Sequence, residues 1–275
     1  MRKNLDKATV DSFGDEWDRF NQSNLPPQEA QKIFDKYFSI FPWKSLPNHA
    51  EGFDLGCGSG RWAKIMVKKV GHLHCVDPSN AIHIAEKSLA SDANTTFHKK
   101  SVDDFPLSAN SQDFGYSLGV LHHVPNTAAA IKKCAEKLKP GAPFLMYLYY
   151  ALENKSFMYK SLWKCSDFFR RIICRLPSGI KHFVTDFIAI IIYLPFAKIC
   201  LILEKFGIDV SDFPLSFYRN CSFYTMRTDS RDRFGTPLEQ RFTKSEISEL
   251  MVEAGFKDII FSDIEPRWCV VGIKS

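Results

Sequence analysis

The eight cysteines of this chain form no Cys-x-x-Cys pair, and no histidines and cysteines gather at the spacing of a zinc site. That absence argues against a structural metal, and we expect none. The first seventeen residues lack the apolar run of a secretory signal and carry several acidic residues. Because several cysteines fall inside apolar runs, we expect reduced thiols in the core of a cytoplasmic protein.

Strong charge of either sign is also missing. The formal net charge is +5 and the sequence pI is about 8.7, which a solvated basic surface explains better than a phosphate-bearing or membrane partner does. No separate basic arm or RNA-binding module is visible, so nucleic acid is an unlikely partner. With 45% hydrophobic residues, the 275-residue chain can bury a full core, and we expect one domain with an elaboration.

The most informative stretch is GFDLGCGSGRW, residues 52–62, in which an apolar run breaks into alternating glycines and then becomes amphipathic. This pattern predicts a strand, a glycine-rich turn and a helix. Gly56, Gly58 and Gly60 bring no side chains between backbone and ligand, and the following helix start offers unpaired N–H groups. The next apolar run ends in Asp77, an acid that suits the two hydroxyls of a ribose.

These motifs resemble those of the class I S-adenosylmethionine-dependent methyltransferases, whose first motif reads like DLGCGSG at residues 54–60. The run SVDDFPLSANSQDFGYSLGVLHHV, residues 101–124, resembles the adenine loop, the fourth strand and the turn after it. KLKPGAPFLM, residues 137–146, resembles the following helix end, Pro-Gly turn and fifth strand. The resemblance spans residues 51–150 in the order and spacing of the family. It implies S-adenosylmethionine as cofactor and S-adenosylhomocysteine as product.

The expected fold is α/β and Rossmann-like, a mostly parallel seven-stranded sheet with helices on both faces and a helical lid insertion. Strands are predicted near 51–55, 72–76, 94–98, 113–118 and 143–149, and helices over 61–70, 80–90 and 126–138. Thr243 and Glu246 form a capping-box pattern before a helix that ends at Gly255, and two closing antiparallel strands follow. We expect a capping segment at 1–40, a core at 41–150 and 236–275, and an insertion at 151–235.

The resemblance also implies positions for the cofactor. Asp54 and the three glycines match the methionine-binding turn of the family, and Asp77 matches its ribose acid. At the adenine loop the family commonly begins with an acid where this chain has Ser101, so Val102 and Asp103 become the candidates. Leu118, at the tip of the fourth strand, is expected under the methionine portion, although simple strand packing is the alternative.

The N-terminal pattern FGDEWDRF, residues 13–20, matches aromatic segments that relatives place over the cofactor. Trp17 is therefore a candidate cap, since an aromatic face attracts a sulfonium cation and excluding water favours the dispersed charge of the transition state. A helix packed on the sheet edge is the alternative.

His122 and His123 follow the fourth strand, where the carboxyl ends of parallel strands meet a ligand. Either histidine is a candidate base for a substrate hydroxyl or amine. The alternative is that the pair only holds its loop by hydrogen bonds.

The insertion begins with an amphipathic basic pattern over residues 158–176, followed by the nearly continuous apolar run of residues 183–203. The run approaches the length of a bilayer crossing, but Asp186, Pro195 and Lys198 interrupt it. We expect two buried helices that form a lid or a homodimer interface, with peripheral membrane contact as the alternative.

Tyrosines and arginines then alternate over residues 214–242. Guanidinium groups bind carboxylate or phosphate through pairs of hydrogen bonds, so one hypothesis is that these arginines bind an anionic methyl acceptor. The other hypothesis is that the arginines form ion pairs with Asp229 and Asp232. The predicted substrate residues are Tyr149, Tyr218, Arg219, Tyr224, Arg227 and Arg231.

The sequence therefore predicts a methyltransferase acting on oxygen or nitrogen of a small polar or anionic molecule. A lipid-linked or quinone-like acceptor at the membrane surface is one alternative, and an inactive cofactor-binding interaction protein is another.

Overall fold

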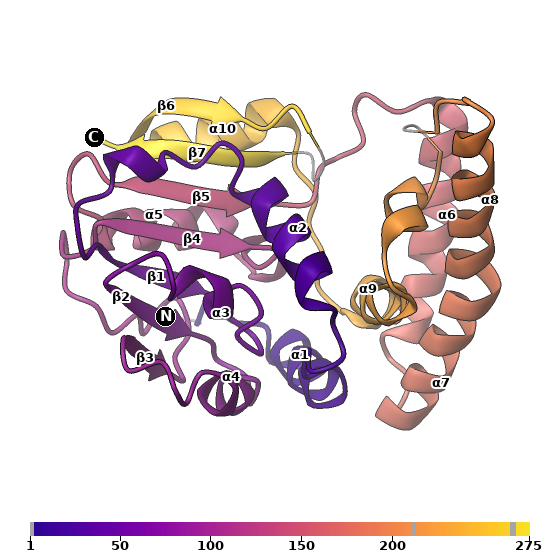
Figure 1. Cartoon of the computed structure of the whole chain (residues 1–275), viewed down its shortest axis with the longest axis horizontal. Helices are drawn as coiled ribbons and strands as arrows, with labels where there is room; N and C mark the ends of the chain where they lie inside the picture. Colours follow the sequence, from indigo (N-terminus) through magenta and orange to yellow (C-terminus); the bar gives the residue numbers. More distant parts are fainter. Residues whose placement is uncertain (1–2, 211–212, 265–267) are drawn as a thin grey trace. The chain divides into compact units, whose positions relative to one another are not determined.

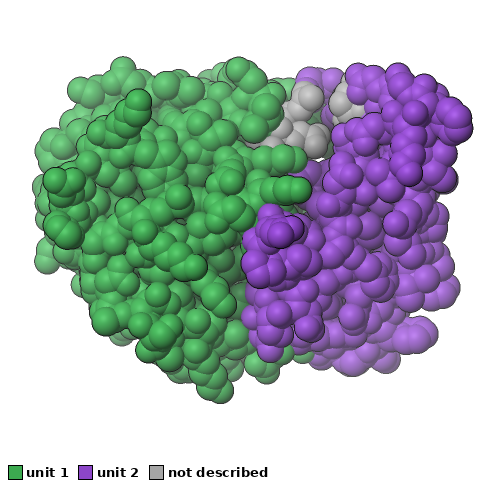
Figure 2. All heavy atoms as spheres, in the orientation of Figure 1, with its two compact units in different colours: residues 1–18, 30–153, 238–275 green, residues 19–29, 154–237 purple. Residues whose placement is uncertain are grey.

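A computed structural model describes residues 3–210, 213–264 and 268–275 of the chain. The chain divides into two compact units (Figures 1 and 2). Unit 1 comprises residues 1–18, 30–153 and 238–275, and unit 2 comprises residues 19–29 and 154–237. The residues between the two predicted closing strands, 265–267, lie outside the described part. Each unit is considered by itself below.

Unit 1 is built on a seven-stranded sheet in the order β3-β2-β1-β4-β5-β7-β6 (Figure 1). Its neighbours pair in parallel up to β5, and β7 runs antiparallel to both β5 and β6. This confirms the predicted Rossmann-like class. The strands are β1 Glu51–Leu55, β2 His72–Val76, β3 Thr95–His98, β4 Phe114–Leu118, β5 Pro143–Tyr147, β6 Phe256–Phe261 and β7 Cys269–Lys274.

Two helices of unit 1 begin at residues whose side chains cap them. Asn126 accepts a hydrogen bond from the Ala129 N–H at the start of α5, and Thr243 and Glu246 complete the predicted capping box of α10. The helices that contribute to unit 1 are α1 Lys7–Arg19, α2 Pro27–Tyr37, α3 Ala63–Met66, α4 Ile82–Ser88, α5 Thr127–Lys137 and α10 Lys244–Glu253.

The helix predicted over 61–70 is confined to the four residues of α3. Hydrogen-bonded turns fill the rest of the predicted span.

The core of unit 1 lies on both faces of the sheet. On one face Phe34 of α2 and Met66 of α3 pack with Leu73 and Tyr116 of the sheet. On the other face Ile131 of α5 and Met251 of α10 join a second set of buried sheet residues (Figure 1). Both faces of the parallel strands are thus covered, as burial of a parallel sheet requires.

Unit 2 is helical. It contains α6 Phe157–Ile173, α7 Ser178–Ile188, a π-helical turn Ala189–Tyr193, α8 Leu194–Lys205, the 3-10 turn Ser216–Asn220 and α9 Phe223–Gly235. Its small core joins Ile173, Tyr193, Ala197, Met226 and Phe234. Within the described residues, the continuous helix Ser178–Lys205 is the one element long and apolar enough to cross a membrane, and an 18-residue stretch of it has a mean hydropathy of 2.2.

The apolar helices of the insertion, which were expected to be buried in a lid or in a homodimer interface, are largely exposed in the single chain. Only 28% of the apolar 18-residue stretch within the helix Ser178–Lys205 is buried, and the Phe183 side chain is 72% exposed. The buried stripe of this helix consists of small or polar residues spaced three or four apart, namely Lys181, Thr185, Ala189, Tyr193, Ala197 and Cys200. The large apolar side chains therefore point away from the rest of unit 2.

Candidate functional site

The glycine-rich turn connects β1 to α3 at the carboxyl end of the sheet. Gly56, Gly58 and Gly60 have φ angles of +80°, +54° and +81°, which glycine adopts without strain. A Cβ on Gly56 would lie 2.3 Å from Val120 Cγ2, and one on Gly58 would lie 3.1 Å from the Trp17 indole nitrogen. A side chain at Gly56 would therefore clash with Val120, and one at Gly58 would crowd Trp17.

Asp77, which directly follows β2, is hydrogen-bonded to this turn. One carboxylate oxygen accepts the Gly58 N–H at 2.9 Å, and the other accepts the N–H and hydroxyl of Ser79 at 2.8 and 2.6 Å. Burial raises the pKa of Asp77, and the Ser79 and Gly58 donors oppose that rise. The carboxylate keeps lone pairs beyond these three bonds.

Asp54 is buried at the end of β1, beneath the glycine turn. Burial raises its pKa to about 8, and the nearby charge of Asp77 acts in the same direction. The carboxyl group is therefore largely protonated at neutral pH, although a cation placed beside it would favour the ionised form.

The predicted adenine loop is divided between core and surface. Val102 packs in the core with Phe105, whereas the exposed Asp103 carboxylate accepts the backbone N–H of Asn4. Leu118 is partly buried against the core. The Ser101 hydroxyl is buried and has no hydrogen-bond partner among the described residues.

Helix α1 lies along the carboxyl ends of β1 and β4. Trp17 reaches the glycine turn, and the Arg61 guanidinium lies 5.6 Å from the Trp17 ring. One turn earlier, the Phe13 ring meets His123 edge-on with centroids 5.1 Å apart. Strand order reverses between β1 and β4, and ligands of open α/β sheets bind at such a switch point.

The two predicted histidines form the 3-10 turn Leu121–His123 directly after β4. His123 Nδ1 lies 2.6 Å from the Leu238 carbonyl oxygen, so this ring holds the loop. His122 is fully buried and stacks on Tyr149 with centroids 3.9 Å apart. Neither nitrogen of His122 has a hydrogen-bond partner within residues 3–210, 213–264 and 268–275.

Burial lowers the pKa of His122 well below its usual value, and the neighbouring His123 and Arg241 charges lower it further. The His122 imidazole is therefore neutral at physiological pH. A neutral ring retains one nitrogen lone pair that can accept a proton.

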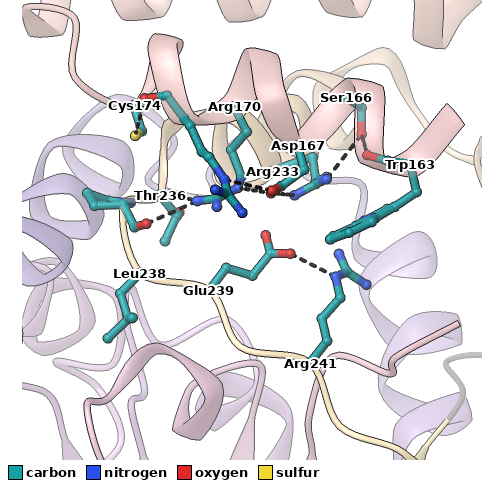
Figure 3. Close-up of polar contacts among 12 residues, drawn as sticks. Trp163, Ser166, Asp167, Arg170, Cys174, Arg233, Thr236, Leu238, Glu239 and Arg241 are labelled. Atoms are coloured by element: carbon teal, nitrogen blue, oxygen red, sulfur yellow. Dashed lines mark hydrogen bonds and ion pairs between the residues drawn. The ribbon is translucent and has the colours of Figure 1, made fainter. Parts of the chain in front are cut away.

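Arg241 and Glu239 complete this group of side chains. Arg241 belongs to the tyrosine- and arginine-rich segment of residues 214–242, whereas Glu239 was not predicted as a site residue. Arg241 pairs with Glu239 at 2.8 Å (Figure 3). Its guanidinium lies 5.1 Å from the centroid of the Tyr149 ring. The isolated bridge between Tyr150 and Phe242 brings this segment beside the end of β5. A long-range bridge of this kind has no local sequence signal.

The other predicted substrate residues lie in unit 2, where contacts within that unit engage them. Arg219 pairs with Glu204 at 2.9 Å, and Arg227 pairs with Asp186 at 2.8 Å. The Tyr224 hydroxyl accepts the Gln22 N–H at 2.9 Å. Tyr218 packs on Tyr193, and Arg231 is fully buried. The structure thus gathers His122, His123 and Tyr149 in unit 1 and the remaining five predicted residues in unit 2.

The donor set at the switch point suits an S-adenosyl ligand. Ser59 and Ser101 carry buried hydroxyls without partners among the described residues, and His122 adds a buried ring in the same state. Such groups are costly unless a ligand or water satisfies them.

Comparison with known proteins agrees with this geometry. Residues 53–146 match the family described as "Methyltransferase domain". A tRNA (carboxymethyluridine(34)-5-O)-methyltransferase of Schizosaccharomyces pombe is 29% identical over 46% of this chain and 59% of its own length. A ubiquinone biosynthesis O-methyltransferase of Xanthomonas axonopodis is 25% identical over 52% of this chain and 61% of its own length. The matches thus span about three-fifths of these curated relatives.

A solved structure of Haemonchus contortus phosphoethanolamine N-methyltransferase 2, in complex with phosphomonomethylethanolamine and S-adenosylhomocysteine, shares the fold. It is 16% identical, with a TM-score of 0.50 over 93% of this chain and 47% of that one. The motifs, the strand order and the match over residues 53–146 together show that the chain contains a class I methyltransferase domain, for which S-adenosylmethionine is the cofactor.

Proposed function

We propose that the chain transfers the methyl group of S-adenosylmethionine to an oxygen or nitrogen of a small molecule, and that His122 accepts the proton. One observation carries this proposal: the His122 ring is buried and neutral, and neither of its nitrogens has a hydrogen-bond partner among the described residues. His122 lies two residues after Val120, whose side chain packs against Gly56. In the transfer the acceptor atom bonds to the methyl carbon as the carbon–sulfur bond breaks. The proton of the acceptor passes to His122, and neutral S-adenosylhomocysteine leaves.

We assign cofactor binding to Trp17, Asp54, the three glycines, Asp77, Val102, Asp103 and Leu118, as the family resemblance implies. The geometry gives strongest support to Trp17 and Asp77, because both contact the glycine turn. Placing the two reactants in line supplies much of the acceleration in such a reaction. His123 serves as a positioning residue for its loop.

The side chains beside His122, Tyr149 and Arg241, favour a polar or anionic acceptor. Tyr149 presents an aromatic face and a hydroxyl group, and Arg241 adds a guanidinium over that ring. Arg241 is itself paired with Glu239, as Arg219 and Arg227 are paired with acids in unit 2, so an anionic acceptor would replace the Glu239 carboxylate in order to bind Arg241.

A lipid-linked or quinone-like acceptor is the second candidate. It is supported by the exposed apolar helices of unit 2 and by the ubiquinone O-methyltransferase relative. A tRNA methyltransferase is also among the relatives, so the expectation against nucleic acid stays a prediction.

The acceptor class is tested by incubating the purified chain with methyl-labelled S-adenosylmethionine and a lysate of the source organism. Label in the aqueous small-molecule fraction is expected. Label in the organic fraction would favour the second candidate. Label only in RNA or protein, or no transfer at all with cofactor bound, would contradict the proposal.

Replacing Trp17 by alanine is expected to weaken S-adenosylmethionine binding about 2- to 30-fold, since a cation–π contact contributes about 0.5–2 kcal/mol. S-adenosylhomocysteine, which lacks the sulfonium charge, should lose less affinity. Calorimetric titration with both ligands measures the difference, with Trp17→Phe as the matched control. Equal losses for the two ligands would mean that Trp17 only packs α1 on the sheet.

Cofactor affinity should rise with pH because Asp54 has a pKa raised to about 8. Below that pH the ammonium group of the cofactor must displace a proton from Asp54, so Kd should fall by up to about tenfold per pH unit between pH 6.5 and 8. Titrations in buffers of different ionisation heat should show proton release at pH 7. Asp54→Asn should bind more weakly with a smaller pH dependence. The same pH dependence in Asp54→Asn would assign the proton to another group.

A further inference from the structure

Unit 2 has an inverted distribution of polarity. Among the described residues, all but three of the exposed large hydrophobic side chains belong to this unit, and the three in unit 1 are Val252, Ile260 and Ile264. Phe157 and Met158 of α6 are more than 80% exposed. A soluble monomer rarely exposes so much contiguous apolar sequence without a partner for it.

Several polar groups are buried in the same unit, in addition to its small apolar core. The buried Arg170 donates to Asp167 at 2.7 Å and to the Thr236 carbonyl oxygen at 2.8 Å (Figure 3). The buried Ser230 hydroxyl donates to the Thr185 carbonyl oxygen at 2.8 Å. Polar groups that satisfy one another inside, with apolar groups outside, suit a helical unit in contact with an apolar medium.

The exposed apolar residues follow helical stripes. On α6 the stripe comprises Met158, Leu162, Phe169 and Ile172, and on the helix Ser178–Lys205 it comprises Ile180, Phe183, Phe187, Ile190, Ile191, Ile199 and Ile202. The second stripe extends along a helix of 28 residues, about 40 Å at 1.5 Å per residue. That length greatly exceeds what a small ligand would cover.

The charges on these helices favour an anionic surface as the occupant. Each acid of α6, α7 and α8 pairs with an arginine of unit 2: Asp167 with Arg170, Asp186 with Arg227 and Glu204 with Arg219. Lys164, Arg175, Lys198 and Lys205 are exposed beside the stripes. Lysine and arginine next to an apolar stripe are typical of helices that lie in the headgroup region of a membrane.

The helix Ser178–Lys205 suits a position in the plane of the membrane rather than across it. One face is buried and carries Lys181 and Thr185, and Asp186 lies among the arginines of unit 2. Charged groups at the centre of a bilayer are costly. We propose that the apolar stripes of α6, α7 and α8 dock unit 2 onto the surface of an anionic lipid bilayer, with the helices lying in the interface.

The test is flotation of the purified full-length chain with vesicles of phosphatidylcholine, with and without about 30 mol% phosphatidylglycerol. The wild-type chain should float with the anionic vesicles, less so at high salt. Phe183→Ser/Phe187→Ser, which removes two exposed rings, should lower vesicle partitioning at least about tenfold. The matched control Val252→Ser/Ile260→Ser alters equally exposed residues of unit 1 and should float like the wild type.

Cofactor binding and circular dichroism verify that each variant is folded. Because neither these controls nor flotation depends on methyl transfer, a failure of this inference can be distinguished from a failure of the proposed function. An absence of flotation would overturn the proposal. A dimer in solution that Phe183→Ser/Phe187→Ser dissociates, without vesicle binding, would assign the surface to a second copy of the chain. Resistance to alkaline carbonate extraction would overturn the in-plane arrangement in favour of a spanning helix.

Discussion

Replacing His122 by glutamine is expected to lower kcat about 10²- to 10⁴-fold, because the ring supplies the lone pair that takes the acceptor proton. The affinity for S-adenosylmethionine should change little, since the loss falls on the transfer step. Because burial holds the pKa of His122 well below its usual value, the ring is already deprotonated above neutral pH. The wild-type rate should therefore gain nothing from this group between pH 7 and 8. Single-turnover transfer of labelled methyl groups measures the rate.

His123→Gln is the matched control for that variant. Its ring contacts the Leu238 carbonyl oxygen, so the substitution should lower stability by about 1 kcal/mol and affect the rate far less. If His122→Gln keeps the wild-type rate with cofactor and acceptor saturating, alignment alone drives the transfer and His122 only packs on Tyr149.

Gly56→Ala is expected to abolish cofactor binding and to lower the free energy of unfolding by about 2–5 kcal/mol. A residue with a Cβ at positive φ costs about 1–2 kcal/mol, and overpacking adds about 1–3 kcal/mol. At this position φ is +80° and the new Cβ would lie 2.3 Å from Val120 Cγ2. Urea unfolding and calorimetric titration with S-adenosylhomocysteine measure the two effects.

Gly141→Ala separates backbone strain from the clash. Gly141 has a φ of +83°, yet a Cβ there would meet no atom within 4 Å. This variant should lose only about 1–2 kcal/mol and bind the cofactor normally. The double variant Gly56→Ala/Val120→Ala should recover part of the lost stability. An equal cost for Gly56→Ala and Gly141→Ala would show that the close approach of Val120 is unimportant.

The sheet and its turns could be predicted because their signals are local. The apolar runs marked five strands to within two residues, and Thr243 and Glu246 marked the start of α10. The glycine spacing predicted a turn with backbone open to a ligand. Trp17 was a candidate because of the aromatic pattern of residues 13–20, whereas the close approach of Val120 to Gly56 could not be predicted from the glycine spacing.

The helical insertion was predicted less well, because an apolar stripe does not reveal what covers it. Met158, Leu162, Phe169 and Ile172 were recognised as one face of a helix, and the structure leaves that face exposed. Likewise, alternating tyrosine and arginine cannot show which acid neutralises each cation. Arg227 finds Asp186 forty-one positions earlier, a pairing that depends on the tertiary packing of α7 against α9.

The most direct test of the cofactor site is hydrogen–deuterium exchange of the purified full-length chain with and without S-adenosylhomocysteine. We predict slower exchange in the glycine turn at residues 54–60, in residues 118–123 after β4 and in α1 around Trp17, because these segments meet at the strand-order switch point. Saturable binding without protection in these segments, or with protection confined to other parts of the chain, would contradict the account.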